Sequence, residues 1–234
     1  MTDRLGLRPH AVRREDREDG TIVLHSAYDL GPVDRSTGVW LDRWANATPD
    51  ALFLAERAGS GWRTLTYSEA RAHVHALAAG LLGRAIDCPI MILSGNSIDH
   101  ALLSLAAQYV GLITVPVAEQ YSLIPAAHDR LRYVADLVKP ALVYATDGDA
   151  YAEALKLLDC PAICSDVGDS GAIPLDLLKQ GRADIHAAHK AVGSDTVAKL
   201  LLTSGSTSDP KAVETTHGMM TFNQAQIRDA LPFL

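Results

Sequence analysis

Residues Leu201–Gly218 read LLTSGSTSDPKAVETTHG. A predicted strand over Val197–Leu202 leads into this stretch, and a predicted amphipathic helix over Met219–Leu231 follows it. Small hydroxyl residues around a glycine let backbone amides approach an anion, and a nearby lysine adds a mobile positive charge. The order of strand, hydroxyl-rich loop and helix therefore predicts a phosphate-binding site. Its candidate residues are Thr203, Ser204, Gly205, Ser206, Thr207 and Lys211.

This loop differs from the Walker A phosphate loop. Walker A requires G-x-x-x-x-G-K-[ST], and Pro210 stands where the second glycine would have to precede Lys211. A Ser/Thr-rich surface turn is the alternative interpretation, because such clusters are common between elements. The specific order of the residues favours phosphate binding over a plain turn.

The same order resembles a known family. The pattern resembles the phosphate loop of the adenylate-forming superfamily: T-S-G-S-T, then three residues ending in proline, then lysine. That superfamily includes acyl-CoA synthetases, luciferases and peptide-synthetase adenylation domains. Ser208 and Ala212 depart from that pattern, since the family commonly has glycine at both positions. If residue 208 needs a left-handed backbone, serine costs about 1 kcal/mol there and nucleotide binding would weaken.

The composition is that of an ordinary globular protein. The chain has 234 residues, of which 48% are hydrophobic and 21% charged, enough for one sizeable domain or two small ones. The net charge of −7 argues against nucleic acid as the main partner. No apolar run is long enough to span a membrane, and the N-terminus lacks an apolar signal core. We therefore expect a cytoplasmic protein without a membrane partner.

Strands and helices alternate along most of the chain. A β-hairpin is predicted over Leu52–Arg57 and Trp62–Tyr67, and Thr66 with Glu69 forms a capping box that starts a helix. The alternation predicts an α/β fold with a mostly parallel sheet and flanking helices. The predicted strands after the hairpin are Pro89–Leu93, Leu112–Val117, Ala141–Ala145, Pro161–Cys164 and Val197–Leu202, and the main predicted helices are Val39–Ala47, Ile98–Val110, Pro125–Val138 and Ala150–Leu158.

The three cysteines do not predict a metal site. Cys160 and Cys164 form C-P-A-I-C, but no nearby pair of Cys or His residues supplies two further ligands. We expect them, with Cys88, to be free thiols, and we expect Cys160 and Cys164 to be buried. No residue is assigned to a metal.

The resemblance implies a two-step reaction. A carboxylate attacks the α-phosphate of ATP to give an acyl-adenylate and pyrophosphate, and a thiol, usually of coenzyme A, then displaces AMP. The loop would hold the β- and γ-phosphates, and magnesium would accompany them. Within the superfamily, L-A-E-R, G-W-R-T-L-T-Y, I-L-S-G-N-S-I-D-H-A-L-L and P-K-A-V look most like feruloyl-CoA synthetase and related aryl acid–CoA ligases. A hydroxycinnamate-like acid is the substrate this implies.

The resemblance also implies an incomplete enzyme. Family members continue well past the loop, so residues 1–234 are expected to be the N-terminal part of an AMP-binding domain with the C-terminal domain absent. We expect this part to be inactive as a ligase alone, and the apolar face of the helix over Met219–Leu231 suggests a homodimer. A non-catalytic nucleotide- or anion-binding α/β module is the alternative function, and an unrelated α/β domain whose loop is only a turn is a third.

Overall fold

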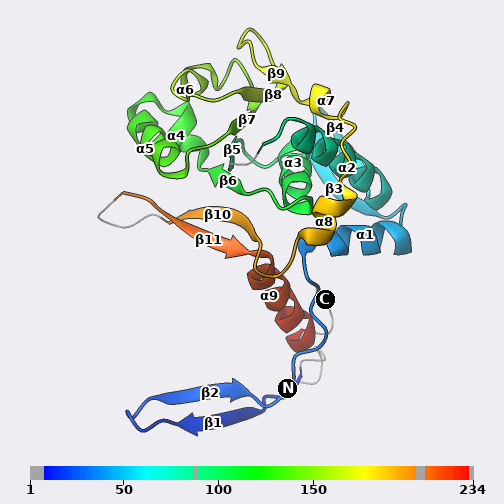
Figure 1. Ribbon diagram of the computed structural model, residues 1–234, viewed down its shortest axis with the longest axis vertical. Coiled ribbons are helices and arrows are strands. Elements are labelled where there is room, and N and C mark those ends of the chain that lie inside the picture. Colours follow the sequence, from blue (N-terminus) through cyan, green and yellow to red (C-terminus); the bar gives the residue numbers. More distant parts are fainter. Residues whose placement is uncertain (1–7, 87–88, 204–208, 232–234) are drawn as a thin grey trace.

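The structure of the protein, a computed structural model, describes residues 8–86, 89–203 and 209–231 (Figure 1). Its centre is a seven-stranded sheet in the order β11-β10-β6-β5-β7-β8-β9, in which every neighbouring pair except β10–β11 is parallel. The predicted α/β fold with a mostly parallel sheet is thereby confirmed. The strands are β5 Ile90–Leu93, β6 Thr114–Val117, β7 Leu142–Asp147, β8 Ala162–Asp166, β9 Ile173–Pro174, β10 Val197–Thr203 and β11 Lys211–Thr216.

Helices cover both faces of the sheet, and the central strand β5 is therefore buried on both sides. Ile90 and Ile92 belong to one apolar cluster, and Met91 and Leu93 belong to the other, as the twofold period of a strand requires. The first cluster packs under α1 Thr37–Ala47, α2 Tyr67–Gly83, α3 Ile98–Tyr109 and α7 Leu175–Leu178. The second packs under α4 Glu119–Leu123, α5 His128–Val138 and α6 Ala152–Leu155.

The predicted hairpin and capping box are both present. Strands β3 Leu52–Ala58 and β4 Gly61–Thr66 pair as far as Ala58, which is opposite Gly61. The turn therefore has two residues in place of the predicted four. The Thr66 side chain accepts the backbone N–H of Glu69, and the Glu69 side chain accepts that of Thr66. This reciprocal pair fixes the start of α2.

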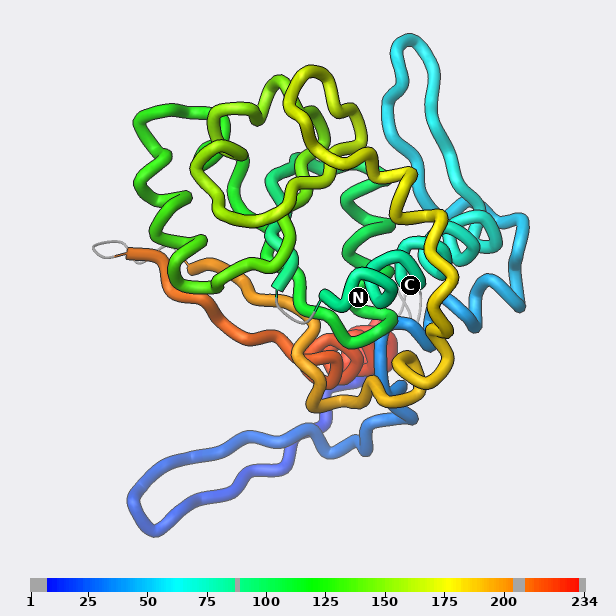
Figure 2. Tube along the Cα trace, turned by 45° about the horizontal axis from the view of Figure 1, so that its top comes forward, coloured from blue at the N-terminus to red at the C-terminus, as the bar shows by residue number. Residues whose placement is uncertain are grey.

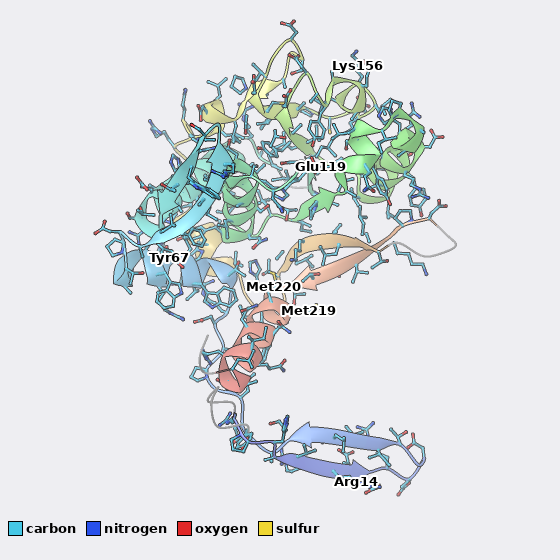
Figure 3. All side chains as sticks on the ribbon, turned by 180° about the vertical axis from the view of Figure 1, so that it is seen from behind. Arg14, Tyr67, Glu119, Lys156, Met219 and Met220 are labelled. Carbon is cyan, nitrogen blue, oxygen red and sulfur yellow. The ribbon has the colours of Figure 1, made fainter. Side chains whose placement is uncertain are left out.

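A second two-stranded ribbon precedes the sheet. Strands β1 Val12–Asp16 and β2 Ile22–Ser26 pair with each other and with no other strand of the described residues. The ribbon lies beyond the far end of α9 His217–Ala230, and Arg14 marks its exposed surface (Figure 3). Figure 1 shows this ribbon and the β10–β11 hairpin near opposite ends of α9, and Figure 2 shows that both extend toward the same side of the molecule.

The apolar residues along α9 are only partly covered. Met219 is 60% exposed and Phe222 is 48% exposed, although Thr221 and Ala225 on another side of the helix are buried. Figure 3 places Met219 and Met220 at the end of α9 that adjoins the β10–β11 hairpin. Self-association through this helix stays a prediction.

Two predicted helices are shorter than the sequence suggested. Pro125–Val138 divides into a 3-10 turn over Pro125–Ala127 and α5, and the separate helix α4 precedes it. The predicted helix Ala150–Leu158 retains α-helix only in α6. The Asp147 carboxylate accepts hydrogen bonds from the backbone N–H groups of Asp149 and Ala150. These bonds hold the segment before α6 as a turn and not as the first turn of a helix. The remaining helix, α8 His186–Ala191, leads toward β10.

None of the helices in the described part of the chain has both the length and the apolar character needed to cross a membrane.

Candidate phosphate-binding site

The antiparallel pair β10–β11 carries the predicted phosphate site. In its register Leu202 faces Ala212 and Thr203 faces Lys211, so the last residue of β10 is opposite the first residue of β11. The structure thus brings two of the six predicted residues together. The other four, Ser204, Gly205, Ser206 and Thr207, lie outside the described residues, as does Ser208.

Thr203 and Lys211 are both exposed at the mouth of the hairpin. The Thr203 hydroxyl lies 3.4 Å from the carbonyl oxygen of Lys211, to which it donates. Over residues 8–86, 89–203 and 209–231, no carboxylate forms an ion pair with the Lys211 ammonium. Its side chain is therefore available to pair with an incoming anion.

The predicted order of strand, loop and helix needs a correction. Strand β11 stands between the loop and α9, and Thr216 caps that helix by accepting the backbone N–H of Met219. The β-branched residues Val213, Thr215 and Thr216 favour this extra strand. At about 3.3 Å per residue, its six residues place the start of α9 about 20 Å from Lys211. The positive end of the α9 dipole therefore cannot contribute to phosphate binding at the loop.

A polar cluster lies at the carboxyl ends of the central strands. From β5 the chain goes first to β6 on one side and then to β7 on the other side of β5. The boundary between β5 and β7 is therefore a topological switch point. Open α/β sheets commonly bind ligands at such a point, beside the carboxyl ends of the strands. Glu119 follows β6, and the Tyr151 hydroxyl, which follows β7, donates to its Oε1 at 2.9 Å. A Cβ on Gly95, which follows β5, would lie 2.9 Å from that carboxylate.

This cluster contains a buried phenol beside an exposed acid. Tyr151 is 3% exposed, and burial, with the nearby Glu119 carboxylate, raises the pKa of Tyr151 to about 12. The phenol is therefore a neutral donor at ordinary pH. In Figure 3 Glu119 lies within the outline of the upper body of the molecule. The sequence analysis missed Glu119, although its position directly after a predicted strand was a usable signal.

A second group of charges near the same edge has a structural role. Arg63 on β4 pairs with Glu56 on β3 at 3.0 Å and with Asp99 on α3 at 2.8 Å. Glu56 also accepts the backbone N–H of Ile98, and Ser165 donates to Asp99. Burial acts to raise the pKa of Asp99, but hydrogen bonds from Arg63 and Ser165 outweigh it and hold that pKa below its usual range. These groups are mutually satisfied, so they fasten the β3–β4 hairpin to α3.

The described residues do not offer a protein-built metal site. Within residues 8–86, 89–203 and 209–231, no three His, Cys, Asp or Glu side chains gather in a way that could hold a metal ion. Cys164 is buried in β8 and Cys160 is partly buried, and both are free thiols, while Cys88 lies outside the described residues.

Comparison with known proteins identifies the family. Residues 41–233 match the family described as AMP-binding enzyme. This chain belongs to the AMP-binding enzyme family. The mostly parallel sheet with flanking helices agrees with this membership.

Two curated relatives are ligases of mycobacteria. The long-chain-fatty-acid–CoA ligase FadD15 of Mycobacterium bovis is 28% identical over 178 residues, which cover 72% of this chain and 29% of FadD15. The long-chain-fatty-acid–AMP ligase FadD32 of Mycolicibacterium smegmatis is 28% identical over 209 residues, which cover 86% of this chain and 32% of FadD32. This AMP-binding chain thus spans about a third of the length of these relatives.

Solved structures support the fold. The crystal structure of VinN aligns with a TM-score of 0.67 and 26% identity, covering 87% of this chain and 49% of VinN. A fatty acyl-adenylate ligase from L. pneumophila, solved with acyl adenylate and pyrophosphate, aligns with a TM-score of 0.65 and 21% identity. The alignment covers 86% of this chain and 34% of the ligase. The second likeness shows the fold alone.

Proposed function

We propose that this chain is the N-terminal part of an ATP-dependent ligase that activates a carboxylic acid as its acyl-adenylate and passes the acyl group to a thiol, in the reaction of coenzyme A ligases. Residues 1–234 then form the N-terminal portion of an AMP-binding domain. In this reaction the loop at residues 203–211 holds the β- and γ-phosphates of ATP and stabilises the departing pyrophosphate.

The observation that carries this proposal is the pairing of Thr203 with Lys211 across the β10–β11 hairpin. The two residues stand where β10 leads into, and β11 leads out of, the intervening sequence S-G-S-T-S-D-P, whose small residues admit a phosphate. The Lys211 ammonium has no competing carboxylate among the described residues.

Two classes of acid compete as the substrate. The short stretches similar to aryl acid–CoA ligases suggest a hydroxycinnamate, but the curated relatives FadD15 and FadD32 carry fatty-acid names and match far longer segments. We therefore favour a long-chain fatty acid over a hydroxycinnamate. The acceptor thiol of coenzyme A follows from the FadD15 name and is part of the same proposal.

The test has two arms. Pyrophosphate and magnesium-ATP are titrated into this chain by calorimetry, and saturable binding to the wild-type chain supports the phosphate site. In the second arm, a complete AMP-binding domain that contains these residues is incubated with ATP and either palmitate or ferulate. Any acyl-adenylate that forms is trapped with hydroxylamine.

Hydroxamate from palmitate at the higher specificity constant supports a fatty-acid ligase, and a preference for ferulate would reinstate the aryl acid. Nucleotide binding without hydroxamate from any acid would favour the non-catalytic nucleotide-binding module. The absence of both pyrophosphate and ATP binding would contradict the proposed phosphate site.

A further inference from the structure

His217 lies where three helices meet the base of the β10–β11 hairpin. It is the first residue of α9, follows β11 directly and is 0% exposed. Its Nδ1 lies 3.3 Å from both the backbone nitrogen and the hydroxyl of Thr37, the first residue of α1. The Thr37 hydroxyl is also 3.1 Å from Oε1 of Gln108, near the end of α3. The imidazole therefore joins α9 to α1 and, through Thr37, to α3.

The hydrogen-bond pattern fixes the form of the imidazole. The backbone N–H of Thr37 can only donate, so Nδ1 of His217 must be the unprotonated acceptor and the ring proton must reside on Nε2. Nε2 makes no well-formed hydrogen bond among the described residues, although the backbone of Gln108 is close enough to act against the fall in the pKa of His217. A buried donor left unpaired costs about 1–3 kcal/mol, a cost that an apolar side chain at this position would avoid. What histidine supplies here is the acceptor at Nδ1.

The backbone on either side of His217 is tied to the segment that enters β10. The N–H of His217 donates to the carbonyl of Thr196 at 3.0 Å, and the N–H of Gly218 donates to the carbonyl of Ser194 at 2.8 Å. A Cβ on Gly218 would lie 2.9 Å from that Ser194 oxygen, so glycine permits this close approach. β10 thus begins, and β11 ends, at one junction at the base of the hairpin.

The backbone of the hairpin has few other attachments. Strand β10 pairs with β6 at Lys199 and Thr114 alone, and the Thr114 hydroxyl donates to the carbonyl of Ala198. Toward the loop the hairpin is held by side chains, with Leu200, Leu202 and Ala212 packed against the second apolar cluster. At about 3.3 Å per residue, Thr203 lies about 13 Å beyond the Lys199 pairing. The backbone attachments of the hairpin are therefore concentrated at its base.

We propose that His217 is a positioning residue, whose hydrogen bond from Thr37 fixes the base of the β10–β11 hairpin on α1 and α3 and so determines where Thr203 and Lys211 meet a phosphate. Its effect on phosphate binding rests on the proposed function, whereas its effect on the hairpin does not. Figure 1 shows the arrangement: the hairpin and α9 diverge from this junction while the remaining strands lie within the sheet.

Three variants separate positioning from general stability. His217→Leu removes the acceptor and keeps an apolar side chain in the buried space. His217→Asn restores an oxygen acceptor close to the position of Nδ1 and serves as the conservative rescue. Thr37→Val removes the hydroxyl and retains the backbone N–H, so the first contact with Nδ1 persists. This milder variant keeps the test available if His217→Leu does not fold.

The measurement is native-state hydrogen exchange of the wild type and the three variants, with pyrophosphate titration beside it. We expect His217→Leu to accelerate exchange over 197–203 and 211–216 by about tenfold or more while the amides of β5 and β7 are unchanged. Pyrophosphate affinity should fall by about tenfold. His217→Asn should restore both, and Thr37→Val should give a smaller acceleration confined to the same segments.

Equal acceleration in the hairpin and in β5 would reduce His217 to a general core residue and overturn the inference, as would unchanged exchange in the hairpin. Should the wild-type chain bind no pyrophosphate, the proposed function fails, and the exchange result alone decides whether His217 positions the hairpin.

Discussion

Thr203 and Lys211 are directly opposed in the register of β10 and β11, with the Thr203 hydroxyl 3.4 Å from the Lys211 carbonyl oxygen. The contact joins the two ends of the loop through the Lys211 backbone and leaves its ammonium group uncommitted. A side chain that serves a ligand and not the fold can be removed without loss of stability.

Lys211→Ala should therefore weaken pyrophosphate and ATP binding by about tenfold or more, because a charged hydrogen bond to phosphate contributes about 1.5–3 kcal/mol. The melting temperature should stay unchanged, since an exposed lysine adds little stability. Lys190→Ala, at another exposed lysine on α8, is the matched control for charge. Unchanged affinity in a folded Lys211→Ala variant would remove this residue from the site.

Thr66→Ala should destabilise the chain by about 1 kcal/mol, because it removes the side chain that caps α2. For a chain of this size that loss lowers the melting temperature by about 2–4 °C. Thr66→Ser keeps the capping oxygen and should retain most of the stability. A fully stable Thr66→Ala variant would show that the capping box contributes nothing measurable.

Tyr151→Phe should cost about 1 kcal/mol at neutral pH through loss of the hydrogen bond to Glu119. Burial raises the folded-state pKa of Tyr151 from 10.0 to about 12, so its proton-linked stability is present below pH 10 and is lost as the pH rises toward 12. Denaturant titrations across this window should show a shallower alkaline decline for the variant than for the wild type. Parallel declines would contradict the assigned environment.

Acid should loosen the junction at His217. Burial lowers the folded-state pKa of His217 from 6.5 to about 4, with Arg35 and His189 as the nearby charged or titratable groups. The contribution of neutral His217 is thus present above pH 6.5 and is lost as the pH falls toward 4. In urea titrations from pH 7 to 4, His217→Asn should lose less stability than the wild type. An identical pH profile for both proteins would refute this assignment.

The 234-residue chain alone should not complete adenylation. Catalysis needs the acid, the α-phosphate and the phosphate-holding groups fixed together, and a misplacement of about 1 Å can cost a hundredfold. This chain spans about a third of FadD15 and FadD32. Hydroxamate trapping with palmitate or ferulate should give no product above background. Turnover equal to that of a complete ligase would disprove the expectation.

The central sheet could be predicted because its signals are local. Strand β5 is a run of four apolar residues, and the capping box at Thr66 marks the start of α2 within four residues. Alternation of such strands with helices is enough to indicate a parallel sheet. The same reasoning located the segment that holds Thr203 and Lys211, although only those two of the six proposed residues lie within the described part of the chain.

The features that the sequence did not predict depend on distant contacts. Strand β11 was missed because none of the residues in K-A-V-E-T-T is buried and the segment forms a strand by pairing with β10. His217 has no distinguishing local pattern, and its role arises only when α1, from 180 residues earlier, brings Thr37 against it. Glu119 and Tyr151 likewise meet across 32 residues.

The single pairing between β6 and β10 has a consequence for biosynthesis. The Thr114 hydroxyl bonds to the carbonyl of Ala198, 84 residues later, so this flank of the sheet cannot close until β10 has left the ribosome. Until then β6 presents an unpaired parallel edge, which is slow to pair and open to other chains. A nascent chain that pauses before residue 197 would therefore expose this edge to aggregation, and a chaperone that shields the edge would be useful at that length.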